Sequence, residues 1–478
     1  MQRRETTPNI IFLEFNELCP PLLEKWMAAG LLPNFRKFYD ASQVFTTMPD
    51  VESPEHLEPW IQWYSIHTGL AYDDHKVFNL TDGPSAGHAD IWKLLQEAGY
   101  TVGNIASMNA AGLDQSGSFF MSDPWCASER AFPQTLQPIQ DFVQQRVQNY
   151  SLPNEAVLTS TLRNVALLQR LVQSGLSART ISIILSQLIS EKTGGNTSWK
   201  RVALLDHILF DIFKKYYCSS APSFSTFFAN STAHLQHAYW RFMEPEAFDI
   251  TPSDEDLATY GSAVFFGYQN MDRLLGRFFE LEKRGATLVL MSALSQQPFT
   301  KRETSNGQLF YRPYDMDRLL GLLDIPVANA EPVMTHQYIL RFDSEESKDS
   351  ALPKLENFTF DGTSVFDTGT SDDKSLFVGC GLFEEIPDNA KVTLPASRGT
   401  NEKKETEFFD LFYKIDEIKS GCHHPDGVLW FKLGDHKVHP DKVSILDVLP
   451  TLLEIYGVKR SLSAMQGHSL MPYLHACL

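Results

Sequence analysis

Short apolar runs alternate with amphipathic stretches along much of the chain. The run 9–13 is followed by a stretch, 20–30, that begins with proline and ends at glycine, as helices commonly do. The stretch 91–99 has apolar residues three and four positions apart and leads into the apolar run 100–106. Further apolar runs predict strands at 224–229, 287–291 and 427–431. Strands that alternate with helices form parallel sheets covered on both faces, so the pattern predicts an α/β fold.

Two long stretches interrupt this alternation. Between 130 and 220 the chain has long helical patterns, which predict helices at 157–176, 177–189 and 202–217 and together an inserted helical cap. From 311 to 419 charged and turn residues increase and the apolar pieces become short, which predicts a smaller α+β insertion. The remaining segments, 1–129, 221–310 and 420–478, are then expected to form the α/β core.

Composition limits the class of protein and its partners. A chain of 478 residues with 43% hydrophobic content can bury a large core. The net charge of −18 argues against nucleic-acid partners and anionic membrane surfaces, which bind clustered Lys and Arg. None of the six cysteines has a Cys-x-x-Cys spacing, the N-terminal apolar run 10–13 is too short for a signal peptide core, and no segment approaches the length of a membrane span. We therefore expect a globular cytoplasmic protein with reduced cysteines.

The apolar run 287–291 ends in a small, uncharged loop that contains Ser292, Ala293 and Leu294. Ligands of open α/β sheets bind outside the carboxyl ends of the strands, so this loop is a candidate site. In the alkaline phosphatase superfamily, and especially in its type I phosphodiesterase and nucleotide pyrophosphatase branch, the same strand ends in Ser-Asp-His-Gly, whose Asp and His bind a metal. The sequence resembles this branch, but neither Ala293 nor Leu294 can donate a lone pair to a cation.

The first predicted strand carries a second landmark of the resemblance. The family strand ends in Asp-Gly and is followed by Leu-Pro-Asn, which stands here at 32–34. Asn16 occupies the position of the metal-binding Asp and is flanked by Glu14 and Glu17. Alternation along a strand places Glu14 on the face of Asn16, where it could replace the missing carboxylate. Ordinary hydrogen bonding at a strand end is the alternative interpretation.

The segment 63–69 resembles the family's Trp-x-Ser-x-x-Thr-Gly, which follows the catalytic nucleophile. Counting back ten residues from Gly69 places the nucleophile at Pro59, which has no hydroxyl group. Glu58 and Ser53 are the nearest alternatives, although Ser53 before a proline is typical of a helix cap. Glu58 and Gln62 lie one helical turn apart and are expected to share a face.

Two histidine motifs complete the resemblance. The segment 233–240 is similar to the family's Asp-x-x-Gln-His-x-x-Trp, with Ala233 in place of Asp and His237 as the metal-binding histidine. The segment 421–427 is similar to Gly-Thr-His-x-x-x-Gly, which assigns His423 to the same metal site. His234 could supply a third nitrogen, and three imidazoles suffice for zinc. His237 and His423 could equally bind an anion or act as acid and base without a metal.

The resemblance implies an alkaline-phosphatase-like fold and an enzyme that hydrolyses or transfers a group of a small anionic substrate. A phosphorylated, sulfated or sugar-nucleotide substrate is expected, with at most one divalent ion, which would be zinc, manganese or iron. A non-catalytic ligand- or partner-binding relative is the alternative, and Ala293 and Leu294 fit it directly. The predicted catalytic residues are Glu58, His237 and His423, the predicted metal ligands are His234, His237 and His423, and the predicted substrate-binding residues are Glu14, Asn16, Glu17, Gln62 and His67.

Overall fold

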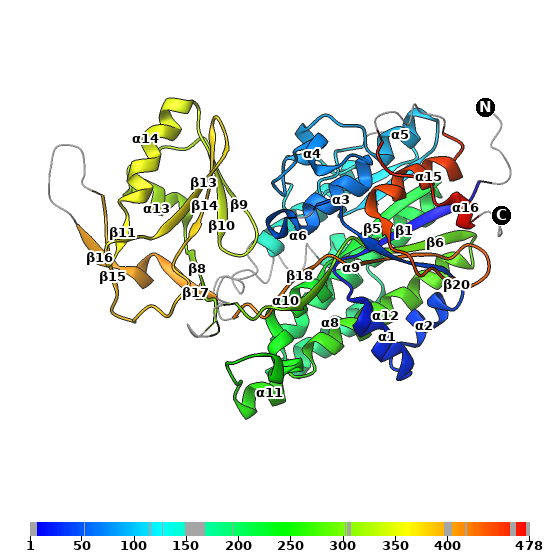
Figure 1. The fold of residues 1–478 in the computed structure, drawn as a ribbon, viewed down its shortest axis with the longest axis horizontal. Coiled ribbons are helices and arrows are strands. Elements are labelled where there is room, and N and C mark those ends of the chain that lie inside the picture. Colours follow the sequence, from blue (N-terminus) through cyan, green and yellow to red (C-terminus); the bar gives the residue numbers. More distant parts are fainter. Residues whose placement is uncertain are drawn as a thin grey trace.

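A nine-stranded sheet runs through the protein in a computed structural model (Figure 1). The structure describes residues 7–51, 53–113, 116–126, 128–148, 168–194, 196–301, 303, 307–395, 404–415, 418–458 and 465–474. In spatial order the strands are β20 (Lys437–Val438), β2 (Gln43–Met48), β19 (Gly427–Phe431), β6 (Ala286–Ser292), β1 (Asn9–Phe15), β5 (Phe224–Ala229), β3 (Val102–Ile105) and β4 (Phe119–Met121), and β21 (Val443–Ser444) pairs with β2.

The pairing directions confirm the predicted α/β fold with a mostly parallel sheet. Strands β6, β1, β5, β3 and β4 are adjacent in that order and parallel to one another. Strand β19 is antiparallel to both β6 and β2. Since five neighbouring strands share one direction, their carboxyl ends meet at one edge of the sheet, where a site is expected.

Helices cover both faces of the sheet (Figure 1). One face carries α3 (Pro59–Thr68), α4 (Tyr72–His75), α5 (Ile91–Glu97) and α15 (Val448–Ile455), with α16 (Met471–Leu474) beside them. The other face carries α1 (Pro20–Ala28), α2 (Pro33–Tyr39), α8 (Ala178–Lys192), α9 (Val202–Ser220), α10 (Ser231–Met243), α11 (Asp254–Tyr260) and α12 (Ala263–Glu282). Helix α6 (Gln137–Gln148) follows β4 in the chain.

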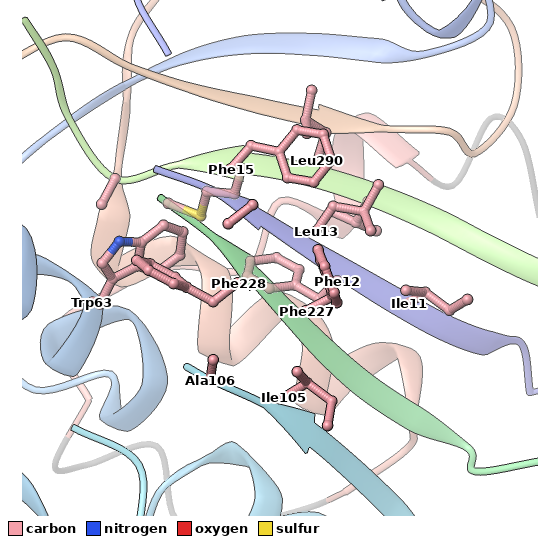
Figure 2. Packing of buried hydrophobic residues seen from close by; sticks show 14 of the residues in the cluster. Ile11, Phe12, Leu13, Phe15, Trp63, Ile105, Ala106, Phe227, Phe228 and Leu290 are labelled. Atoms are coloured by element: carbon pink, nitrogen blue, oxygen red, sulfur yellow. The ribbon is translucent and has the colours of Figure 1, made fainter. Parts of the chain in front are cut away.

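Neighbouring residues of β5 show how the two faces are packed, because successive side chains of a strand point to opposite faces. The ring centroid of Phe227 lies 5.5 Å from that of Phe213 on α9 and 5.1 Å from that of Phe278 on α12. The next residue, Phe228, lies 6.1 Å from Trp63 on α3 (Figure 2). Helix α9, which the sequence places in the helical cap, therefore packs on the sheet.

The predicted cap helices at 177–189 and 202–217 correspond to α8 and α9. The predicted helix 157–176 lies mostly outside the described residues. The assignment of 130–220 to a separate cap stays a prediction.

The segment 310–415 forms a group of short elements with its own hydrophobic core (Figure 1). Its antiparallel sheets have the orders β13-β14-β10-β9, β12-β11-β15-β16 and β17-β8. The elements in chain order are β8 (Phe310–Pro313), α13 (Met316–Leu322), β9 (Asn329–Pro332), β10 (Gln337–Arg341), α14 (Glu345–Glu356), β11 (Thr359–Phe360), β12 (Thr363–Ser364), β13 (Phe366–Asp372), β14 (Ser375–Cys380), β15 (Lys391–Thr393), β16 (Glu405–Glu407) and β17 (Phe412–Ile415).

A further strand pair, β7 (Ser295–Pro298) with β18 (Gly421–His424), connects this segment to the sheet. It places His423 opposite Gln296.

In the described part of the chain, no helix combines the length and the apolar composition that crossing a membrane requires.

A carboxylate of α12 fixes the start of α2. The N-cap residue Leu32 has no side chain that can accept a hydrogen bond. The backbone N–H groups of Asn34 and Phe35 instead donate to Asp272 Oδ1, at 2.9 and 2.8 Å, and the Asn34 side chain donates to Asp272 Oδ2 at 2.8 Å. Since the first N–H groups of a helix have no partner within the helix, Asp272 stabilises α2 from a distant part of the chain.

We expect Asp272→Ala to lower the free energy of unfolding by about 2–3 kcal/mol, because three hydrogen bonds to a charged acceptor are lost. Urea unfolding followed by circular dichroism measures the change. Asp254→Ala, at the exposed start of α11, is the matched control and should stay within about 0.5 kcal/mol of the wild type. Equal stability of the two variants would contradict this role of Asp272.

Candidate functional site

The candidate site lies where β1, β5 and β6 end. Asn16 and Glu17 directly follow β1, α10 begins just after β5, and β7 follows β6. Glu17 has a positive φ of 60°, which turns its side chain out of the alternation of the strand. The turn brings the carboxylate of Glu17 against α10 and the β7–β18 pair.

Glu17, His237 and His423 form a compact group. Their potential ligand atoms all lie within 4.8 Å of one another. Nε2 of His237 is 3.1 Å from Oε2 of Glu17, and Nε2 of His423 is 3.7 Å from Oε1 of Glu17. The side chain of Glu17 is 3% exposed and that of His237 is 32% exposed, so solvent reaches the group from the side of His237.

The backbone orients both imidazole rings. Nδ1 of His237 lies 3.0 Å from the carbonyl oxygen of Gly421, which can only accept, so Nδ1 carries a proton and Nε2 is the atom that faces Glu17. His423 forms a backbone hydrogen bond with Leu57, while its buried Nε2 has no hydrogen-bond partner. Histidines that ligate metals usually donate their other N–H to such a group, so both rings are presented as ligands are.

The charge of Glu17 is compensated on several sides. Asn16 Nδ2 donates to Glu17 Oε1 at 3.0 Å, and Gln296 Nε2 donates to Oε2. Burial alone would raise the pKa of Glu17, but the nearby His237 and His423 and the hydrogen bonds with His237 and Gln296 lower the pKa to about 2. Glu17 is therefore a carboxylate at neutral pH. Burial lowers the pKa of His423 to about 4, so this imidazole is neutral and able to coordinate.

Asn16 is held by three polar neighbours at the position of the family's metal-binding Asp. Trp63 Nε1 donates to Asn16 Oδ1 at 2.9 Å, and Asn16 Nδ2 also donates to Asn230 Oδ1 at 2.8 Å. The amide is therefore already engaged as donor and acceptor. Ala293 and Leu294, which directly follow β6, are fully buried. A second cation would find no charged ligand among these residues.

Glu58 reaches the group from the start of α3. Its Oε2 lies 3.5 Å from Nδ1 of His423, and its side chain remains 28% exposed. Burial, which outweighs the attraction of Lys419, raises the pKa of Glu58 to about 8. Gln62, one turn further on α3, is buried; its Nε2 donates to the His56 carbonyl at 3.3 Å and its Oε1 has no partner. Glu58 therefore lies beside the group, with Gln62 behind it.

Two predicted substrate-binding residues lie deeper in the protein. Glu14 shares the α3-facing side of β1 with Asn16, as alternation predicts, but its Oε1 is 2.9 Å from Nε2 of His67. Both side chains are almost completely buried, and the His67 ring lies 4.6 Å from Trp92. Glu14 and His67 therefore form a buried pair, and the carboxylate that joins the histidines is Glu17.

The predicted metal ligand His234 does not belong to the group. On α10, the Ala233 carbonyl, Gln236 and His237 all contact the site. His234 lies three residues before His237 on the same helix, but its nitrogens are not among the ligand atoms that converge. The third potential metal ligand, which we expected to be His234, is Glu17.

Gln296 was not among the residues predicted from the sequence. Besides Glu17, its Nε2 donates to the Ala233 carbonyl at 3.0 Å. Its position depends on the pairing of β7 with β18, which joins segments far apart in the sequence. The only signal in the sequence is that Gln296 follows the strand end at 292 by four residues.

We expect Asn16→Asp to destabilise the protein by about 2 kcal/mol in the presence of a chelator, because an acceptor then faces the buried Glu17 carboxylate. Thermal unfolding at neutral pH measures the effect. Asn329→Asp is the control, since Asn329 also donates to a glutamate, Glu331, but at the exposed surface and 3.2 Å away. An equal loss in both variants would show that Asn16 and Glu17 are not electrostatically coupled.

Comparisons with known proteins give a likeness in fold. No protein-family model and no curated protein matches the sequence. Among solved structures, human ectonucleotide pyrophosphatase/phosphodiesterase 5 is 10% identical, with a TM-score of 0.41, and the match covers 98% of this chain and 99% of that chain. The murine protein is 9% identical (TM-score 0.39; 98% and 100% covered). Phosphonoacetate hydrolase from Sinorhizobium meliloti 1021, in complex with phosphonoacetate, is 13% identical (TM-score 0.40; 96% and 98% covered). All three are members of the alkaline phosphatase superfamily, which the sequence motifs resemble.

Proposed function

We propose that the protein is a hydrolase of a small anionic ester and uses one divalent cation held by Glu17, His237 and His423. The observation that carries this proposal is the convergence of three electron-pair donors on one point. Nε2 of His423 is buried without a partner, 3.7 Å from Glu17, and Nε2 of His237 faces the same carboxylate at 3.1 Å. A lone pair facing a carboxylate is repulsive unless a proton or a cation lies between them.

The donor set indicates which cations fit. Two imidazole nitrogens and one carboxylate suit zinc, manganese or iron, whereas calcium and magnesium prefer oxygen ligands alone. A bound cation with an open position would polarise an ester oxygen and lower the pKa of a water molecule. Because Asn16, Ala293 and Leu294 replace the charged ligands of the second family site, we propose a single ion.

The other residues of the site complete the chemistry. Pro59 has no hydroxyl group, so we propose that water attacks the ester directly. Water then gives a hydroxyl group to the central atom of the ester and a hydrogen to the departing alcohol. Glu58, whose Oε2 lies 3.5 Å from His423 Nδ1 and is partly exposed, is placed to carry the proton to the leaving oxygen.

Lys419 favours an anionic substrate. Its positive charge acts on both Glu58 and His423, so it lies near the rim of the site. Its Nζ lies 4.8 Å from the ring centroid of Phe299, and no carboxylate is within ion-pair distance in the described parts of the chain. A phosphorylated, sulfated or sugar-nucleotide ester would supply the missing negative charge.

A non-catalytic binding protein is the second candidate. Ala293 and Leu294 are fully buried, and Pro59 starts α3 where a nucleophile would stand. The same Glu17, His237 and His423 would then hold an ion or an anion without turnover. Metal content and hydrolysis, measured separately, distinguish the two candidates.

We expect protein purified without a chelator or a polyhistidine tag to contain about one zinc, manganese or iron ion per chain, because this donor set binds such ions. Glu17→Gln, His237→Ala and His423→Ala should each lose at least about 90% of the metal, since each removes one of three ligands. Mass spectrometry of the elements measures the content.

The control is His234→Ala, on the same helix but outside the group, which should retain the metal. Wild-type protein should also gain thermal stability when the ion is added to the metal-free form. If metal-free protein binds none of the three ions, the metal proposal is wrong.

We expect Glu58→Gln to retain the metal and to lose hydrolysis of phosphate diesters by roughly 100-fold, the range of general acid catalysis. The loss should be larger for phenyl esters than for p-nitrophenyl esters, because a poorer leaving group needs the proton more. Glu97→Gln, exposed on α5, is the control. Equal losses for both ester types would argue against proton donation by Glu58.

A further inference from the structure

A cavity of about 390 Å³ lies between α9 and α12, where α8 begins. It shares no residue with the group around Glu17. Asp211, Lys214, Lys215 and Cys218 line it from one face of α9, at helical spacings of three and four. The three helices lie side by side below the sheet (Figure 1). The cavity is therefore formed by regular, packed elements of the core.

The lining of the cavity is basic, although the chain is acidic. The chain has 59 Asp and Glu against 41 Lys and Arg. The cavity reverses this ratio, with two acids, Asp211 and Glu280, against five cations: Arg179, Lys214, Lys215, Arg277 and Arg284. Cations gathered in this way repel one another unless an anion lies among them.

Both acids are already engaged. Asp211 forms an ion pair with the buried Arg277 and accepts two hydrogen bonds from Ser177, each of 2.8 Å. Glu280 Oε2 lies 2.5 Å from Nζ of Lys214. These contacts pair the two acids with Arg277 and Lys214. The other three cations of the cavity are left without a compensating charge.

Arg179, Lys215 and Arg284 have no carboxylate within ion-pair distance in the part of the chain that the structure describes. Lys215 Nζ donates to the carbonyl oxygen of Gln173, and Arg284 Nη1 lies 3.7 Å from Sγ of Cys218. Neither contact neutralises a charge. All three side chains are exposed, so they can move toward a ligand in the cavity.

We propose that this cavity binds a phosphorylated small molecule. The guanidinium groups of Arg179 and Arg284 are planar and can each bind two phosphate oxygens, and Lys215 adds a third positive charge. The first turn of α8 lies at the cavity, since its N-cap residue Ser177 and Arg179 both line it. A volume of about 390 Å³ is in the range of small-molecule sites, which favours a compact ligand over an extended polymer.

Cys218 provides a reporter that is independent of activity. It is an exposed free cysteine and lines the cavity, whereas Cys19, Cys126 and Cys380 are buried. A ligand held by Arg284 would cover the Cys218 thiol. The rate of alkylation of the peptide that contains Cys218 therefore measures occupancy.

The test uses the full chain with inorganic pyrophosphate as the first probe. Inorganic phosphate and AMP follow, to distinguish a free ion from an organic phosphate, and sulfate at equal ionic strength serves as the control anion. Calorimetry should show saturable binding of pyrophosphate, and iodoacetamide should alkylate Cys218 at least about fivefold more slowly in its presence. Arg179→Ala combined with Arg284→Ala should weaken binding by about tenfold or more.

Arg318→Ala is the matched control, because Arg318 is also an exposed arginine in the first turn of a helix, α13. It should bind pyrophosphate as the wild type does. The proposal is overturned if pyrophosphate does not bind, if sulfate binds equally well, or if the double variant binds and protects Cys218 as well as the control does. Protection of Cys218, and its loss when Arg179 and Arg284 are replaced, report on this cavity alone, so they distinguish it from anion binding at the Glu17 group.

Discussion

The burial of one negative charge determines the arrangement of the candidate site. Glu17 is almost completely removed from solvent at the end of β1, and an unpaired carboxylate there would cost several kcal/mol. This cost is offset by contacts with Asn16, Gln296 and the two histidines, which come from four different parts of the chain. The group is therefore a condition for folding as well as a candidate for binding, and a cation in it would strengthen the connection between β1, α10 and β18.

The sheet makes this convergence possible. The parallel register of β1 with β5 and β6 brings their carboxyl ends to one edge, and the packing of Phe227 and Phe228 against opposite helical layers holds β5 in place. Close contact is required as well: a Cβ atom on Gly421 would lie 2.2 Å from Oε1 of Gln296 and 2.7 Å from the Gln236 carbonyl. Only glycine allows β18 to approach α10 closely enough for the His237 ring to reach its carbonyl.

Much of the fold could be predicted from the sequence, because strands such as 9–13 and helices such as 202–217 carry strong apolar periodicity. The histidines at 237 and 423 could be found from their motifs. The role of Glu17 could not be predicted from alternation, because a left-handed residue turns its side chain away from the face that alternation assigns. Gln296 depends on a pairing between distant segments, and motif spacing alone does not fix which histidine of α10 meets the carboxylate. The helix predicted at 157–176 falls mainly on residues that the structure does not describe.

The position of β19 has a consequence for synthesis on the ribosome. This antiparallel strand, from the last part of the chain, lies between β2, from the first part, and β6. Until residues 427–431 leave the ribosome, both neighbours keep an open edge with unpaired N–H and C=O groups. A chain that stops before β19 would expose two such edges at once, so truncated products should aggregate, and chaperones that bind extended segments should act late in translation.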